Sequence, residues 1–276
     1  MKKPLKILGG VLSAALLLAA VLIANGLFGN PVSGMLARKT ANEYLRTAYP
    51  DTDYYVEGVA YNFKDGNYYA HIRSDSSIDT QFTLYITMTG KLRLDTYDSV
   101  ADGFVTAQRL DSEYRALTDT ILNSAEYPYN AYDSFAFGTL EIYPVEAFAD
   151  MVGNDVPFYA MDQSTLVIDH VYDIRELGRQ SGHLVVYVDS DTVTVEHAAE
   201  IMLNIKALFD AEAIPFAAMD LVLQHPRGED GVQAAGEVAV RHFPYEEIYA
   251  DGLRDRLIQA DAELKAYYAE MDAKYK

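Results

Sequence analysis

The histidine and carboxylate best spaced for metal chemistry are His197 and Glu200. Three positions apart on a predicted helix, they lie one turn apart and could supply two ligands to an ion. Glu196 precedes them, so the three side chains together suggest a metal-assisted hydrolase. The chain contains no H-E-x-x-H motif, so a third ligand must come from elsewhere in the fold. We expect an exposed surface pair instead, because His197 falls on the polar side of its predicted helix.

A second candidate is the segment Asp189-Ser190-Asp191, between a predicted strand and a predicted helix. Two carboxylates suit a hard cation such as Ca²⁺, which takes about six to eight oxygen ligands. The glycine and the distal glutamate of an EF-hand loop are missing here. Asp191 or Thr194 is well placed to cap the following helix, so we expect helix capping from this segment.

The segment Gly178-Arg179-Gln180-Ser181-Gly182 has the ingredients of a nucleophile elbow, but its spacing is not G-x-S-x-G. An elbow follows a strand and opens a helix, whereas this segment precedes a strand, so we predict a turn. The remaining histidines lie without ligand spacing in predicted strands and turns: His71, His170, His183, His225 and His242. The sequence therefore assigns no catalytic, cofactor-binding or metal-binding residue, and predicts no cofactor.

Tyrosine is abundant, with 22 among 276 residues. Five crowd into one predicted hairpin: Tyr54, Tyr55, Tyr61, Tyr68 and Tyr69. Outward-facing rings could form a platform for a glycan or a peptide. Tyrosine is also a good strand former that tolerates half-exposure, so we expect strand packing at most of these positions.

The elements that must position these residues begin with a long apolar segment. Three lysines and no acidic residue precede the apolar run from Ile7 to Ala24, which reaches about 27 Å as a helix, close to the ~30 Å hydrocarbon core. Lysines before a first hydrophobic segment hold that end in the cytoplasm, so the chain after residue 29 should be extracytoplasmic. Ala24-Asn25-Gly26 would suit cleavage of a signal peptide, but the length favours a single-pass transmembrane anchor over residues 1–29.

The rest of the chain is strongly acidic. All 41 Asp and Glu residues follow residue 29, whereas three of the 22 Lys and Arg residues precede it, so the formal charge of this part is 19 − 41 = −22. Nucleic acid and anionic lipid headgroups need a basic surface, so neither is an expected partner. Cations or a basic protein surface would suit it better, although acidic charge also keeps an exported domain soluble.

Beyond the anchor, the sequence predicts an α+β fold of two modules with mainly antiparallel sheets. The first module, residues 30–100, should be a helix packed on a meander with strands at 54–63, 67–73, 80–88 and near 92–94. Residues 101–130 should form a linking helix that ends in a break at Tyr127-Pro128-Tyr129-Asn130.

The second module should occupy residues 131–276. Its predicted strands are 135–143, 165–172, 183–189, 217–225 and 236–243, and its predicted helices are 144–152, 193–211 and 245–273. The run from Leu184 to Val188 is uniformly apolar, which is typical of a central strand covered on both faces. The last helix has a short coiled-coil-like pattern, and packing on its own sheet is favoured over an intermolecular contact.

Several stretches resemble the YfjL-like family of bacterial membrane-anchored proteins. They include NPVS at 30–33, YPDTDY at 49–54 and YNFKDGNYYAH at 61–71 in the first module, and PRGEDG at 226–231, VRHF at 240–243 and IYADGL at 248–253 in the second. The resemblance implies an N-terminal and a C-terminal YfjL-like domain. It carries no known catalytic residues and no assigned biochemical activity.

These features predict a membrane-anchored extracytoplasmic protein with its N-terminus in the cytoplasm. We expect a non-enzymatic module that binds a protein or another envelope component. The alternative is a metal-assisted extracytoplasmic hydrolase that uses Glu196, His197 and Glu200, or the Asp189/Asp191 loop.

Overall fold

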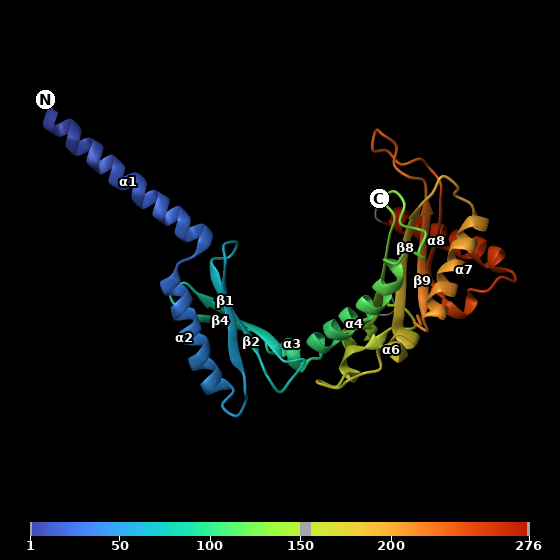
Figure 1. Ribbon diagram of the computed structural model, residues 1–276, viewed down its shortest axis with the longest axis horizontal. Coiled ribbons are helices and arrows are strands. Elements are labelled where there is room, and N and C mark those ends of the chain that lie inside the picture. The colour runs from blue at the N-terminus through green and yellow to red at the C-terminus, as the bar shows by residue number, and fades with distance from the viewer. Residues whose placement is uncertain (1, 150–155, 275–276) are drawn as a thin grey trace. The chain divides into compact units, whose positions relative to one another are not determined.

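The chain divides into two compact units, Met1–Thr106 and Ala107–Lys276, and the computed structural model describes residues 2–149 and 156–274 (Figure 1). Both units combine helices with mainly antiparallel strands, which confirms the predicted α+β class. Two helices lie near the boundary between the units in sequence: the short α3 (Asp98–Ala101) precedes it, and the longer α4 (Phe104–Leu122) runs through it.

The first helix, α1 (Lys2–Phe28), corresponds to the predicted apolar segment. In the described part of the chain this is the one helical region long and apolar enough to cross a membrane, and none of its most apolar window is buried. Leu17, for example, is 69% exposed. By length and composition alone, α1 fits a membrane anchor or a signal sequence.

The first unit packs one helix on a four-stranded antiparallel sheet, as the sequence predicts (Figure 1). The helix α2 (Pro31–Ala48) begins at the cap Asn30, whose side chain accepts a hydrogen bond from the Ser33 N–H at 2.8 Å. The strands, in sheet order, are β1 (Tyr55–Asn62), β2 (Asn67–Arg73), β3 (Gln81–Thr87) and β4 (Leu92–Asp95). Small residues of α2, Ala37 and Ala41, let the helix lie close to the buried face of this sheet.

Two tyrosines of the first hairpin fix the junction between α1 and α2. The Tyr68 hydroxyl accepts a hydrogen bond from the Asn30 N–H at 2.7 Å and donates one to the Asn30 carbonyl at 2.9 Å. The Tyr61 hydroxyl donates to the Gly26 carbonyl at 3.0 Å. We call this group, together with Gly29, the α1–α2 joint. Tyr68 is buried in it, so that ring packs as expected and is not part of an exposed platform.

Gly29 is required in the joint by its conformation and by its neighbours. Its φ is +68°, and a Cβ at this position would lie 2.6 Å from the Tyr68 hydroxyl oxygen. We therefore expect Gly29→Ala to destabilise the first unit by about 2–3 kcal/mol, since it adds left-handed strain to overpacking. Hydrogen exchange of the β1 and β2 amides in the detergent-solubilised full chain would measure this loss.

Gly34→Ala is the matched control, because a Cβ at Gly34 would meet only the Tyr68 ring at 3.6 Å, an ordinary contact. Alanine is also about 1 kcal/mol better than glycine within a helix. Equal protection of β1 and β2 in both variants would contradict the role assigned to Gly29.

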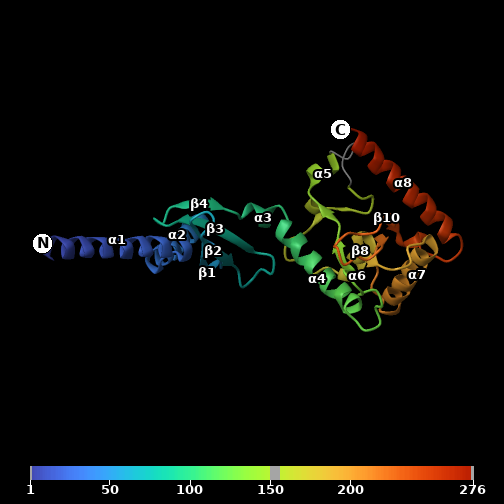
Figure 2. The same cartoon turned by 90° about the horizontal axis from the view of Figure 1, so that it is seen from above.

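The second unit is built on a four-stranded sheet in the order β10-β9-β8-β5. Its strands are β5 (Phe135–Leu140), β8 (Gly182–Asp189), β9 (Ala218–Gln224) and β10 (Glu237–Pro244). Only the β8–β9 pair of this sheet is parallel, and α7 (Val195–Ala211) connects these two strands. The final helix, α8 (Leu253–Lys274), packs on β10 and α7 within the same unit, as predicted (Figure 2).

Alternation along β8 separates the side chains that enter the main core from those on the opposite face. Leu184, Val186 and Val188 are buried in the main core, which also contains the inner face of α7. His183 must therefore point to the opposite face, because successive side chains of a strand point to opposite sides. The central position of β8, between β9 and β5, confirms that part of the prediction. Its second face is only partly covered, because Val185 and Tyr187 are half-buried.

Smaller elements lie between β5 and β8. They are β6 (Ile142–Tyr143), α5 (Val145–Ala149), β7 (Met161–Asp162), the 3₁₀ turn Gln163–Thr165 and α6 (Ile174–Ser181), while a second 3₁₀ turn, Tyr245–Glu247, follows β10. The predicted helix over 144–152 lies partly outside the described residues, at 150–152.

Three local predictions were wrong. No strand forms over 165–172, because the chain turns at Asp169, whose φ is +64°, while Leu166 and Tyr172 pack against a small core. Residues 178–181 are helical and not a turn, since Asp173 caps α6. The last helix begins at Leu253, eight residues later than predicted, after the 3₁₀ turn.

The glycines of the elbow-like motif have a packing role. Tyr114 of α4 is fully buried, and its hydroxyl donates to the Pro215 carbonyl at 2.9 Å. A Cβ at Gly178 would lie 2.5 Å from the Tyr114 ring, and one at Gly182 would clash with the Tyr114 hydroxyl. Both glycines therefore make room for one aromatic side chain.

Candidate functional site

A cluster of polar side chains lies on the face of the second unit's sheet opposite the main core. Its members are Glu141 between β5 and β6, Tyr159 before β7, His183 on β8, Asp220 on β9 and His242 on β10. We call these five residues the histidine cluster. The two imidazole rings are 5.2 Å apart, and the Tyr159 ring lies within 6 Å of both.

His183 is held between two carboxylates. Its Nδ1 lies 2.5 Å from a Glu141 oxygen and its Nε2 lies 2.9 Å from a carboxylate oxygen of Asp220, while only 6% of its side chain is exposed. Burial alone would lower the pKa of His183, but the hydrogen bonds with Asp220 and Glu141 outweigh it and raise the pKa to about 9. His183 is therefore the positive charge that balances two partly buried acids.

The two acids are kept ionised by the same contacts. Burial would raise the pKa values of Glu141 and Asp220, but the hydrogen bonds with His183 bring both below their ordinary range. The Tyr143 hydroxyl also donates to the second Glu141 oxygen at 2.7 Å, and Asp220 accepts a further hydrogen bond from the His242 N–H. The cluster is thus a polarised network in a mostly apolar unit.

A β-bulge brings His242 into the cluster. The pairing of β10 with β9 shifts between Val240 and Phe243, so that Arg241 and His242 together oppose Asp220. His242 has a φ of +50°, uncommon for a residue other than glycine, and its N–H donates to Asp220 at 2.6 Å. The bulge therefore redirects one ladder N–H and one imidazole toward the same carboxylate.

The ring of His242 is only partly satisfied. Its Nδ1 lies 2.8 Å from the Tyr159 hydroxyl, whereas its Nε2 is buried and has no hydrogen-bond partner among the described residues. Burial lowers its pKa, so at neutral pH this imidazole is uncharged and has a nitrogen lone pair available.

One ligand atom from each of His183, Asp220 and His242 lies within 4.8 Å of the other two. Over residues 2–149 and 156–274, this is the one group of three or more His, Cys, Asp or Glu side chains gathered so closely. Two imidazoles and a carboxylate form a donor set that suits Zn²⁺ and related divalent ions.

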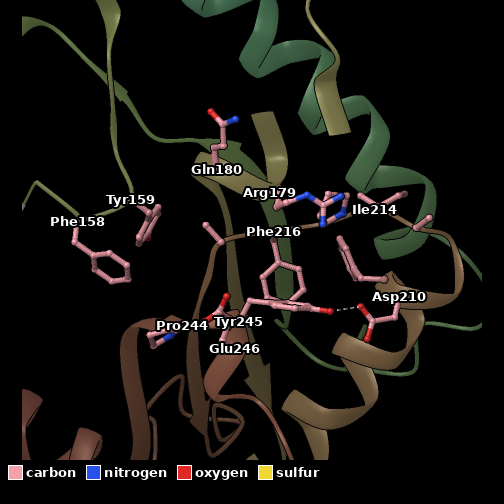
Figure 3. A pocket seen from close by; sticks show the side chains of 14 residues that line it. Phe158, Tyr159, Arg179, Gln180, Asp210, Ile214, Phe216, Pro244, Tyr245 and Glu246 are labelled. Atoms are coloured by element: carbon pink, nitrogen blue, oxygen red, sulfur yellow. Dashed lines mark hydrogen bonds between the residues drawn. The ribbon is translucent and has the colours of Figure 1, made fainter. Parts of the chain in front are cut away.

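A pocket of about 520 Å³ adjoins the cluster and shares Tyr159 with it (Figure 3). Aromatic and apolar side chains dominate its lining, with a few polar groups near its edge. Its lining residues include Phe158, Tyr159, Arg179, Gln180, Phe209, Asp210, Ile214, Phe216, Pro244, Tyr245 and Glu246. A concave apolar surface of this volume with a few polar groups is typical of ligand-binding sites.

The predicted metal pair on α7 gains no third ligand. His197 Nδ1 lies 3.5 Å from a Glu200 oxygen, and Glu196 instead accepts a hydrogen bond from Arg254 at 2.6 Å. Among the described residues, none of these side chains belongs to a group of three or more that could hold a metal ion. The pair is on the surface, as expected, and this geometry does not support the hydrolase site.

The Asp189/Asp191 segment lines a separate shallow pocket of about 430 Å³ together with His197. Asp189 is buried and accepts a hydrogen bond from Gln224 at 2.9 Å, while Thr194 caps α7 by accepting from the His197 N–H. The predicted capping role is therefore confirmed for Thr194.

Sequence reasoning did not identify the histidine cluster. His183 and Asp220 are 37 positions apart and Asp220 and His242 are 22 apart, so no local spacing connects them. The available signal was a single charged residue in an apolar strand, Asp220 within Ala218–Gln224, which requires a buried partner.

Comparison with known proteins matches two family models to the chain. The model described as the YfjL-like N-terminal domain matches residues 4–96, and the YfjL-like C-terminal domain matches residues 113–258, a range that contains the whole histidine cluster. No protein of curated function matches the sequence. A crystal structure of a DUF5037 family protein from Ruminococcus gnavus ATCC 29149 aligns over 82% of this chain and 98% of its own, with 15% identity and a TM-score of 0.26.

Proposed function

The chain belongs to the YfjL-like family, and from its N-terminal helix and its pocket we propose that it is a membrane-anchored binding protein without enzymatic activity. In this proposal α1 is a single-pass anchor with a cytoplasmic N-terminus, and both units lie outside the membrane. The second unit binds a protein or another envelope component.

The observation that carries the proposal is the exposed apolar surface of α1. Leucine side chains along the helix, including Leu12, Leu16 and Leu18, are each more than 60% exposed. Such a surface costs about 25 cal/mol per Å² in water, whereas lipid removes that cost. Lys2, Lys3 and Lys6 precede the apolar run, and basic residues before a first membrane span favour a cytoplasmic N-terminus.

The pocket beside Tyr159 supports a binding role. Phe158, at its edge, is 73% exposed, an unfavourable position for a large aromatic ring unless a partner covers it. Phe209 and Phe216, which also line the pocket, are buried and hold its shape. The excess of acidic residues after residue 29 favours a partner with a basic or neutral surface.

The absence of cysteine from the chain allows a direct test with single-cysteine variants. Phe158→Cys lies in the pocket, and Val232→Cys lies at a position 64% exposed that does not line it. We expect a membrane-impermeant maleimide to label both variants in intact cells. A thiol-linked photo-crosslinker should then give a specific adduct from Phe158→Cys alone.

Labelling of both variants only after cell lysis would reject the extracytoplasmic location. Identical adducts from the two positions, or none from either, would reject the pocket as the binding surface. Recovery of the labelled chain in the soluble fraction after alkaline extraction would reject the anchor.

A further inference from the structure

We propose that His183, Asp220 and His242 form a binding site for Zn²⁺ or a closely related divalent transition metal ion. The site goes beyond the binding role proposed for the pocket and uses different side chains. It lies on three adjacent strands, β8, β9 and β10, so a rigid sheet holds all three ligands.

Two of the three separations between the ligand atoms are close to those of a tetrahedral site, and the third is within 4.8 Å. Ligands about 2.0–2.1 Å from a zinc ion lie roughly 3.4 Å from one another. The His183 Nε2 is 2.9 Å from Asp220 Oδ1, and the His242 Nδ1 is 3.8 Å from the same oxygen. Each of these two separations differs from the tetrahedral value by about half an ångström. Small side-chain shifts, with the two imidazoles moving toward each other, would therefore admit the ion.

Glu141 has the position of an outer-shell partner. A metal-ligating histidine usually gives its other ring N–H to a carboxylate, which fixes the tautomer and the ring orientation. The His183 Nδ1 makes this contact with Glu141, and Tyr143 in turn donates to Glu141. The ion would replace the proton on Nε2, and that proton would be released to solvent.

The bulge in β10 provides the independent evidence. Regular pairing would leave one residue opposite Asp220, but two residues occupy this place and His242 takes a left-handed conformation. Strained, non-glycine conformations of this kind occur preferentially at ligand sites. A purely structural ion pair between His183 and the two acids does not require the imidazole of His242, whose Nδ1 would exchange its contact with the Tyr159 hydroxyl for the ion.

The three ligands differ in their exposure to solvent. His183 is almost completely enclosed, whereas 16% of the Asp220 side chain and 25% of the His242 side chain are exposed. An ion can therefore reach the two more exposed ligands from solvent and then exchange with the inner proton. Arg241 lies 3.8 Å from Asp220 and adds a second positive charge beside this carboxylate.

Calorimetric titration of the chelator-treated full chain with Zn²⁺, in detergent and without a polyhistidine tag, tests the site. We expect one equivalent of zinc to bind with release of a proton, and Ca²⁺ to give no saturable heat because imidazole ligands do not suit it. Glu141→Gln should weaken zinc binding about 10- to 100-fold. His242→Ala should weaken it at least as much.

The matched control is His197→Ala, which removes a histidine on α7 outside the site and should leave zinc affinity unchanged. The visible spectrum of the wild-type chain with Co²⁺ is a second measurement that needs no variant, and it should show nitrogen and oxygen coordination of low symmetry. No saturable zinc binding by the wild type, or an equal loss in His197→Ala, would overturn the proposal and leave a hydrogen-bonded network only.

Discussion

His183→Ala should lower the free energy of unfolding of the second unit by about 3–5 kcal/mol. The change removes the positive charge that lies between Glu141 and Asp220, and it leaves two partly buried carboxylates without their shared partner. Urea unfolding of the full chain in detergent and chelator, followed by hydrogen exchange of the β8 and β9 amides, would measure the loss without any contribution from metal.

The control for this prediction is again His197→Ala. That imidazole lies 3.5 Å from an exposed glutamate, Glu200, so its removal should change the stability by less than about 0.5 kcal/mol. A variant that neutralises all three groups, Glu141→Gln with His183→Gln and Asp220→Asn, should lose less than His183→Ala because no uncompensated charge remains. A larger loss of stability in the triple variant than in His183→Ala would show that uncompensated charge is not the main cost of removing His183.

Tyr114→Ala should destabilise the second unit by a similar amount, about 3–5 kcal/mol, because it empties the volume of a fully buried ring. The ring rests on Gly178 and Gly182, which carry no side chains that could fill the gap. Tyr114→Phe keeps the ring and removes only the hydrogen bond to Pro215, so it should cost about 1 kcal/mol. Urea unfolding of the full chain would separate the two variants.

Phe158→Ala is the matched aromatic control, since that ring is 73% exposed and its removal should change the stability by less than about 0.5 kcal/mol. A loss after Tyr114→Ala no larger than that after Phe158→Ala would contradict the packing role of the two glycines. It would also reopen the question of why the motif from Gly178 to Gly182 has its spacing.

Much of the fold could be predicted because its strands have clear periodicity. The alternation from Phe82 to Met88 placed β3 within one residue at each end, and the uniform apolar run from Leu184 to Val188 identified the central strand β8. Local chemistry was equally direct at α2, where Asn30 and Pro31 begin the helix. These features depend on nearest neighbours in the sequence.

The errors arose where tertiary packing replaced local pattern. Within residues 165–172, Leu166 and Tyr172 pack against the small core of Leu110 and Tyr114 from a turn, whereas Val167 and Val171 are exposed. The helix α6 has only eight residues, and two glycines within and after it concealed it. Its capping residue, Asp173, was the signal that could have revealed it.

The histidine cluster could not be predicted for a different reason. Its position depends on the parallel pairing of β8 with β9 and on a bulge in β10, both of which are properties of the assembled sheet. A regular β10 would have placed one residue opposite Asp220 in place of two. The alternation of side chains in a strand does not reveal where an extra residue is inserted by a β-bulge.

The α1–α2 joint also limits how far the protein can act from its membrane. Only Gly29 and Asn30 separate the two helices, and two residues extend over no more than about 7 Å. Hydrogen bonds with Tyr61 and Tyr68 restrict the extension of this short linker further. Under the proposed anchoring, the first unit is held at a fixed height just above the lipid surface, so it can meet only partners that reside in, or reach down to, the same thin layer.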